Sequence, residues 1–202
     1  MDPIIGDIYV DPAGSNENSG TSPASPFKNI YYGLLSAFAN SSNPGIIHLA
    51  DGTYSPSTNG EFFPLGGKDY VSIIGTSQEG TILNGDSLTS IFHFEDIDDV
   101  TISNLTITNG YASSGGGIYL YNSSPTLDSV RIENNSAISG SGARLVDSDA
   151  TFTNVSIIGN TAIGYAGGMY CYNSNPILQN VLIQNNTSND NAGGIELSPS
   201  SN

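Results

Sequence analysis

The sequence predicts an all-β fold, a right-handed parallel β-helix, in which a solenoid of about 25 residues per coil carries an N-terminal capping helix. Three observations support this prediction: an internal repeat, an alternation of apolar and polar residues within each repeat, and turn-forming residues between the alternating segments. The composition agrees, because the 202 residues include 24 glycines and only 11% charged residues. Helix-rich domains depend instead on Ala, Leu, Glu and Lys.

The repeat fills the second half of the chain, and each coil contains two matching segments. The first segment occurs at residues 117–123, 142–148 and 168–174, and a fourth copy begins at Gly194. The second segment occurs at residues 102–110, 127–135, 152–160 and 178–186. The aligned residues Leu105, Val130, Val155 and Val181 are 25, 25 and 26 positions apart. One coil cannot bury its own apolar face, whereas stacked coils enclose a continuous core.

Apolar residues alternate with polar or aromatic residues inside both segments, which is the period of a β-strand. In the first segment the inward column consists of Ile118, Leu120, Ala143, Leu145, Met169, Cys171, Ile195 and Leu197. In the second segment it consists of Val130, Ile132, Val155, Ile157, Val181 and Ile183. Turn-forming Asn, Ser, Asp and Pro residues separate the segments, so each segment is expected to form a strand.

Asparagines recur at fixed positions of the coil. Asn104, Asn154 and Asn180 share one position, and Asn109, Asn134 and Asn185 share another. Amides that stack at the strand spacing of about 4.7–4.9 Å hydrogen-bond to one another. We therefore expect structural asparagine ladders rather than a set of ligand-binding amides.

The first half is less regular and contains the expected cap. Residues 8–10 form a predicted strand, and residues 26–38 form a predicted helix with Ser25 as its N-cap, which would cover the first coil. Further strands are expected at residues 46–50, 70–74 and 91–94. The chain is interpreted as a single β-helix domain over residues 1–202, with the cap at 1–45, irregular early coils at 46–110 and regular coils at 111–202. Because the coils run on to Leu197, we expect a segment of a longer protein.

Two stretches resemble known families. The residues from Tyr9 to Ser15, together with 18–21, 26–28 and 46–54, resemble the N-terminal region of pectate-lyase-like right-handed β-helix proteins. The coils after Gly115 resemble the Gly-Gly-Ile and Asn-rich coils of polymorphic outer-membrane proteins. The resemblance implies export, so a secreted or cell-surface location is expected, with a signal peptide outside this sequence. It does not imply one activity, because the fold hosts lyases, hydrolases, adhesins and structural proteins.

The charge of the chain excludes several classes of partner. The formal net charge is −15, and the strong bases are only Lys28, Lys68, Arg131 and Arg144, so no nucleic-acid partner is expected. No apolar run approaches the ~20 residues of a membrane span, so no membrane insertion is expected. Cys171 is the only cysteine, which excludes a disulfide within the chain. It aligns with core leucines and is expected to be inert.

Arg144 is the one catalytic candidate within the regular coils. Lyases of the resembled fold use a basic residue beside Ca²⁺, and Arg144 is followed by Asp147 and Asp149. Nearby carboxylates favour the charged form of an arginine, whereas a general base must lose its proton. We therefore interpret these residues as a surface ion pair, and no catalytic residue is predicted.

Other polar groups give weaker candidates. Glu95, Asp96, Asp98 and Asp99 form an isolated acidic corner, which we interpret as solvated rather than as a glycosidase pair. This corner, and the group of Asp11, Asn16, Glu17 and Asn18, offer oxygen ligands to Ca²⁺, but neither has a recognised spacing. His48 and His93 have no assignable Ser or Cys partner. We predict no metal and no cofactor.

The predicted ligand-binding residues are Tyr119, Tyr121, Arg144, Tyr170 and Tyr172, which alternate with the core column and should face outward. Aromatic faces near Asn and Asp groups suit sugar rings or a partner protein, whereas the alternative interpretation is that the tyrosines only shield the sheet. The leading hypothesis is a non-catalytic surface module for adhesion, carbohydrate binding or structural extension, with a polysaccharide or surface protein as partner. The alternatives are a lyase or glycoside hydrolase acting on acidic polysaccharide, and a subunit that self-associates end to end.

Overall fold

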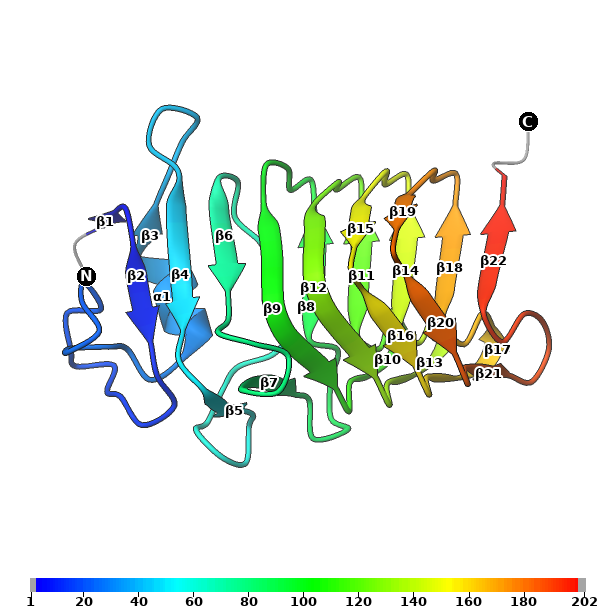
Figure 1. The fold of residues 1–202 in the computed structure, drawn as a ribbon, viewed down its shortest axis with the longest axis horizontal. Coiled ribbons are helices and arrows are strands. Elements are labelled where there is room, and N and C mark those ends of the chain that lie inside the picture. Colours follow the sequence, from blue (N-terminus) through cyan, green and yellow to red (C-terminus); the bar gives the residue numbers. More distant parts are fainter. Residues whose placement is uncertain (1–2, 200–202) are drawn as a thin grey trace.

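The structure, a computed structural model, describes residues 3–199 and is a parallel β-solenoid of about six turns with about 26 residues per turn. Figure 1 shows the strands stacked side by side along the long axis, with β22 (Ile195–Ser198) at the far end from the N-terminus. One helix, α1 (Ile30–Ser36), lies at the N-terminal end of the stack. The predicted right-handed parallel β-helix is confirmed.

The largest sheet contains eleven parallel strands. They are β2 (Ile8–Val10), β4 (Gly45–Leu49), β5 (Gly52–Tyr54), β6 (Val71–Ile74), β7 (Thr81–Asn84), β9 (Thr101–Thr108), β12 (Thr126–Glu133), β15 (Thr151–Thr153), β16 (Ser156–Ile158), β19 (Ile177–Gln179) and β20 (Leu182–Gln184). Ile102 pairs with Leu127, and Leu127 pairs with Phe152. The repeat seen in the sequence is therefore the register of the strands.

Two further sheets complete the regular coils. The five-stranded sheet consists of β8 (Phe92–Glu95), β11 (Ile118–Tyr121), β14 (Ala143–Val146), β18 (Met169–Tyr172) and β22. The four-stranded sheet consists of β10 (Tyr111–Ser114), β13 (Ser136–Ser139), β17 (Thr161–Tyr165) and β21 (Thr187–Ser188). A two-stranded sheet joins β1 (Ile4–Ile5) to β3 (Ala37–Phe38). The sequence did not reveal the four-stranded sheet, because its strands are short and rich in Ser and Ala.

The core lies between the sheets and is built from stacked apolar columns. One column contains Ile118, Ala143 and Met169, and another contains Leu120, Leu145 and Cys171. All six side chains are at most 1% exposed, which confirms their predicted inward positions. Burying a Leu, Ile or Met side chain contributes about 1.5–3 kcal/mol, so the columns hold the coils together.

A buried asparagine ladder supports the turn that follows the long sheet. Asn135 Nδ2 donates to Asn160 Oδ1 at 3.0 Å, and Asn160 Nδ2 donates to Asn186 Oδ1 at 2.9 Å. Asn135 and Asn160 have no exposed surface. The ladder is structural, as expected, but it lies at a coil position that the sequence analysis did not single out.

The two asparagine positions that were predicted as ladders mainly serve the backbone. Asn109, Asn134 and Asn185 adopt φ of 51°, 54° and 55°, and Gly159 takes the same place with φ of 66°. Asn and Gly enter this left-handed region most readily, which explains why one replaces the other. Asn104, Asn154 and Asn180 also have φ of 53–55°, at the bend of the long sheet. Of these, Asn180 Nδ2 does donate to Asn154 Oδ1, at 2.7 Å.

The capping helix is shorter than predicted. It begins at Ile30 rather than Pro26, with Asn29 rather than Ser25 as N-cap, because Phe27 forms a parallel bridge with Val10 of β2. It ends at Ser36, where β3 begins. The N–H groups of Ile30 and Tyr31 donate to the carboxylate of Glu61 at 2.8 and 3.0 Å, so a distant acid replaces the predicted cap. Residues 3–199 contain no helix with the length and apolarity needed to cross a membrane.

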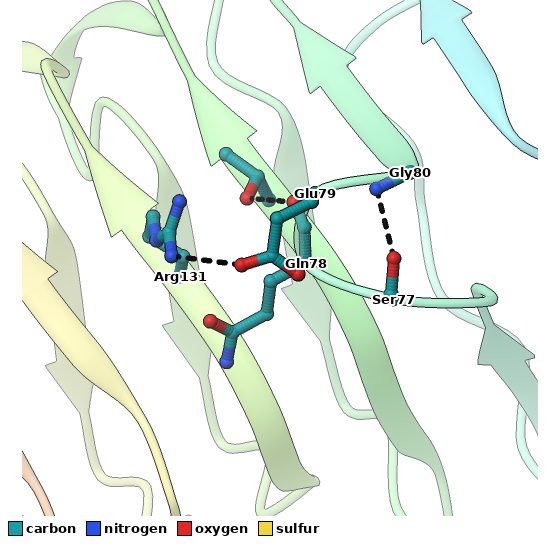
Figure 2. Close-up of polar contacts among 6 residues, drawn as sticks. Ser77, Gln78, Glu79, Gly80 and Arg131 are labelled. Atoms are coloured by element: carbon teal, nitrogen blue, oxygen red, sulfur yellow. Dashed lines mark hydrogen bonds and ion pairs between the residues drawn. The ribbon is translucent and has the colours of Figure 1, made fainter.

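The loop between β6 and β7 lies across the outer face of the long sheet (Figure 2). Arg131 Nη2 of β12 is 3.2 Å from Glu79 Oε1 in this loop. Thr106 donates to the backbone oxygen of Gln78 at 2.7 Å, and Gly80 N–H donates to Ser77 Oγ at 2.9 Å. Because the carboxylate of Glu79 is well exposed, the ion pair contributes only about 0–1 kcal/mol.

Candidate functional site

The outer face of the five-stranded sheet carries two rows of side chains. Alternate residues of each strand point away from the core, and the parallel register aligns them across neighbouring strands. The first row is His93, Tyr119, Arg144, Tyr170 and Glu196. The second row is Glu95, Tyr121, Val146, Tyr172 and Ser198. The strands of both rows lie next to one another in Figure 1.

The five residues predicted to bind a ligand lie together at the centre of this face. We call Tyr119, Tyr121, Arg144, Tyr170 and Tyr172 the tyrosine strip. All five are partly or well exposed, and Tyr121 is the most open, at 40%. The structure therefore places the side chains as the alternation predicted. Their role in binding stays a prediction.

Arg144 is held in place by its neighbours within the strip and beside it. Its guanidinium carbon lies 5.2 Å from the centroid of the Tyr170 ring, and its Nη1 donates to Ser114 Oγ at 3.0 Å. The predicted ion pair of Arg144 with Asp147 and Asp149 is wrong. In residues 3–199 the ion pairs join Arg131 to Glu79 and His48 to Asp7. Arg144 does not reach the aspartates because its side chain runs toward Ser114 of β10, whereas Asp147 and Asp149 follow the end of β14.

His93 and Glu196, which were not predicted as site residues, stand at the two ends of the first row. The imidazole of His93 meets the ring of Tyr119 edge to face, with the centroids 4.8 Å apart. Glu196 pairs in register with Tyr170, on the side away from Arg144. The Phe-His-Phe alternation at residues 92–94 carried the signal for His93, since its phenylalanine neighbours point inward and are fully buried.

The carboxylates that end the two rows are too far apart to act on one sugar. Glu95 lies on β8 and Glu196 on β22, and three strands separate them. At a strand spacing of about 4.8 Å this distance is about 19 Å, whereas paired glycosidase carboxyls lie about 5–9.5 Å apart. The central positions of the rows carry no carboxylate, so the rows contain no glycosidase pair.

The acidic corner after β8 is exposed, as predicted, and continues into a polar ladder. Asn122 Nδ2 donates to Asp96 Oδ1 at 2.5 Å, and Asn173 Nδ2 donates to Asp147 Oδ1 in the same way two coils later. These aspartates therefore accept hydrogen bonds from stacked amides. Within the described part of the chain, no three His, Cys, Asp or Glu side chains are grouped as metal ligands.

The other candidates from the sequence do not meet at a common site. His48 lies on β4 of the long sheet, where it stacks on Tyr9 with the centroids 5.0 Å apart and pairs with Asp7. His93 lies on a different sheet, the five-stranded one. Asn16 Oδ1 accepts the N–H groups of Lys28 and Asn29 and so braces the N-terminal loop. Cys171 is 1% exposed, and burial raises the pKa of its thiol to about 12, as suits an inert core residue.

A family model described as the right-handed β-helix region matches residues 66–202. No curated protein matches the chain.

Solved structures share the fold at low sequence identity. The pectin methylesterase PemA from Erwinia chrysanthemi has a TM-score of 0.51 and 16% identity, and the match covers 87% of this chain and 67% of that one. A pectin methylesterase in complex with a hexasaccharide gives 0.48 and 16%, covering 84% and 66%. The pectate lyase Pel9A gives 0.43 and 15%, covering 86% and 54%. The chain thus spans about two thirds of the pectin methylesterase chains. The predicted right-handed β-helix fold is confirmed by the family model and is shared with PemA.

Proposed function

This chain belongs to the right-handed β-helix family, and on that premise we propose that it is a non-catalytic module that binds polysaccharide through the tyrosine strip. One observation carries the proposal: Tyr119, Arg144 and Tyr170 stand side by side on three adjacent strands. At the strand spacing of about 4.8 Å this part of the row is about 10 Å long. Such a row suits an extended ligand better than a compact one.

The chemistry of the row suits sugars. Tyrosine rings offer apolar faces to the C–H groups of a sugar and hydroxyls to its polar edge. The guanidinium of Arg144 offers donors in a fixed plane to hydroxyl or carboxylate oxygens. Because Ser114 and Tyr170 already hold Arg144, little side-chain entropy is lost when a ligand binds.

The non-catalytic part of the proposal is supported by the same rows. Arg144 is the only strong base among their ten residues, and a guanidinium does not give up its proton at ordinary pH. The carboxylates lie only at the ends. The rows bring no two carboxyls together on one sugar, and their one imidazole, His93, packs edge to face against Tyr119 at the end of the first row.

We place the module outside the cell or at its surface, in an adhesive or structural role. One observation supports this placement: the resemblance of residues 9–15 and 46–54 to exported proteins. The fold is also that of a pectin methylesterase, although this likeness concerns the architecture alone.

The experiment combines binding with a search for cleavage. The folded protein is incubated with polygalacturonate, pectin and a soluble neutral glucan, with and without Ca²⁺. Affinity electrophoresis reports binding, and an assay for new chain ends reports cleavage. Retention without new ends is the expected result. New ends would overturn the non-catalytic proposal and return attention to Arg144 and the acidic corner.

A further inference from the structure

The corner between β17 and β18 differs from the same corner in the earlier coils. Strands β10, β13 and β17 stack in the four-stranded sheet just before the chain turns into the sheet of the tyrosine strip. At their ends, Ser114 pairs with Ser139, and Ser139 pairs with Tyr165. A column of two small hydroxyl residues therefore ends in a large aromatic one, which is 49% exposed.

One inserted residue places Tyr165 at this corner. Ala137 pairs with Ala162, 25 positions later, whereas Ser139 pairs with Tyr165, 26 positions later, and the register shifts between the two pairs. The longer spacing of 26 residues seen in the sequence thus arises from a bulge in β17. Bulges re-aim the side chains next to them, and they are common beside functional sites. Without the extra residue, Gly164 would stand opposite Ser139.

The re-aimed ring reaches the tyrosine strip. The centroids of Tyr165 and Tyr170 are 5.8 Å apart, with the rings tilted by 48°. The same Tyr170 ring carries the Arg144 guanidinium at 5.2 Å. Tyr165, Tyr170 and Arg144 therefore form one continuous contact that passes round the corner between two sheets.

Polar atoms at the same corner have unused hydrogen-bonding capacity. Arg144 Nε and Ser139 Oγ are buried and have no hydrogen-bond partner within the protein. Among residues 3–199 the other buried side-chain atom of this kind is Glu196 Oε2, in the first row of the strip's own face. Buried polar groups normally have a partner, so Arg144 Nε and Ser139 Oγ leave the polar contacts of this corner incomplete.

We infer that Tyr165 is a sixth contact residue of the polysaccharide site, and that the bound sugar chain lies along Tyr119, Arg144 and Tyr170 with Tyr165 as its side wall. This inference rests on the proposed function and extends it. The two ends of the site then differ, because the aromatic wall stands beside Tyr170 of β18 and not beside Tyr119 of β11. The matching positions beside β11 and β14 carry Ser114 and Ser139.

The test is Tyr165→Ser, which restores the residue that the two preceding coils carry. The matched control is Tyr111→Ser, on β10 of the same sheet, which removes another well exposed tyrosine. Isothermal titration with hexagalacturonate and cellohexaose measures affinity. We expect Tyr165→Ser to weaken binding of the retained oligosaccharide by about fivefold or more, and Tyr111→Ser to leave it unchanged.

The outcomes separate this inference from the proposed function. Equal affinities for Tyr165→Ser, Tyr111→Ser and the parent chain would overturn the side wall, provided that Tyr119→Ala with Tyr170→Ala weakens binding. If that double variant binds as the parent does, or if the parent binds neither oligosaccharide, the strip itself is not the site and both proposals fall. Circular dichroism and the urea midpoint show that each variant is folded.

Discussion

The guanidinium of Arg144 lies over the ring of Tyr170, 5.2 Å from its centroid, although the two residues are 26 positions apart in the chain. The contact follows from the coil register, which sets position 144 of β14 beside position 170 of β18. The hydrogen bond from Nη1 to Ser114 Oγ then fixes the guanidinium at the corner of the next sheet. One strong base of an acidic chain is thereby held at the centre of an aromatic face.

The Arg144–Tyr170 contact should show as a coupling energy. In a double-mutant cycle of Arg144→Ala and Tyr170→Ala, the free energies of unfolding should be non-additive by about 0.5–1 kcal/mol, because a cation over a partly exposed ring contributes about this much. Arg131→Ala combined with Tyr170→Ala is the control, since Arg131 lies on the long sheet. Additivity in the first cycle would mean that the contact has no energetic weight.

The asparagine ladder should be far more important for stability than the exposed asparagines. Asn160 is fully buried and bonds to Asn135, Asn186 and the backbone, so Asn160→Ala should lower the free energy of unfolding by about 2–4 kcal/mol. Asn180→Gly keeps the left-handed backbone of an exposed position and should change it by about 0.5 kcal/mol or less. Urea denaturation measures both, and equal losses would refute the ladder's role.

Side-chain packing should contribute less to the free energy of unfolding in the last coil than in the preceding ones. Phe152 is fully buried whereas Leu178, its partner one coil later, is 38% exposed. Phe152→Ala should therefore cost about 3–5 kcal/mol, and Leu178→Ala about 1 kcal/mol. The urea midpoints of the two variants give the comparison. A larger loss of stability for Leu178→Ala than for Phe152→Ala would contradict this difference in burial.

Glu61 should make the cap sensitive to pH. Burial raises the pKa of its carboxyl above the ordinary 4.5, although the N–H groups of Tyr31, Ile30 and Phe62 lower it in part. The folded state therefore holds the proton more tightly than the unfolded chain. The stability that this group contributes is fully present below pH 4.5 and is lost as the pH rises through the folded pKa.

The variant Glu61→Gln isolates that titration, because its amide does not ionise. The free energy of unfolding is measured for both proteins between about pH 4 and pH 7, on either side of the ordinary carboxyl pKa. The parent should lose stability relative to Glu61→Gln as the pH rises. A relative gain by the parent would mean that the N–H groups outweigh burial and that the pKa is lowered.

The regular coils could be predicted from the sequence because the spacing of the repeat equals the register of the strands. Residues such as Leu120 and Leu145 recur every 25 positions, and a shift of one residue would turn them to solvent, so the alternation fixes both the core and the outer row. The same reasoning placed Tyr119 and Tyr170 beside Arg144. It required no information beyond period and spacing.

The features that the sequence did not reveal depend on contacts without a period. The helix starts at Ile30 because Phe27 pairs with β2 and Glu61 binds the helix N–H groups from a distant loop. Tyr165 reaches the strip through a single inserted residue, which appears in the sequence only as one spacing of 26. The Arg144 side chain turns toward Ser114, 30 positions away, rather than toward Asp147 and Asp149, which are close in sequence. Closeness in sequence therefore predicted the wrong partner.

The most direct test of the central claim compares two double variants that each remove two tyrosines. Tyr119→Ala with Tyr170→Ala removes the strip, and Tyr31→Ala with Tyr111→Ala removes two exposed rings elsewhere. Isothermal titration with hexagalacturonate and cellohexaose gives the affinities, and circular dichroism verifies folding. We predict that the strip variant loses at least about tenfold in affinity while the control binds as the parent does. Equal binding by both variants would contradict the account and show that the tyrosines only shield the sheet.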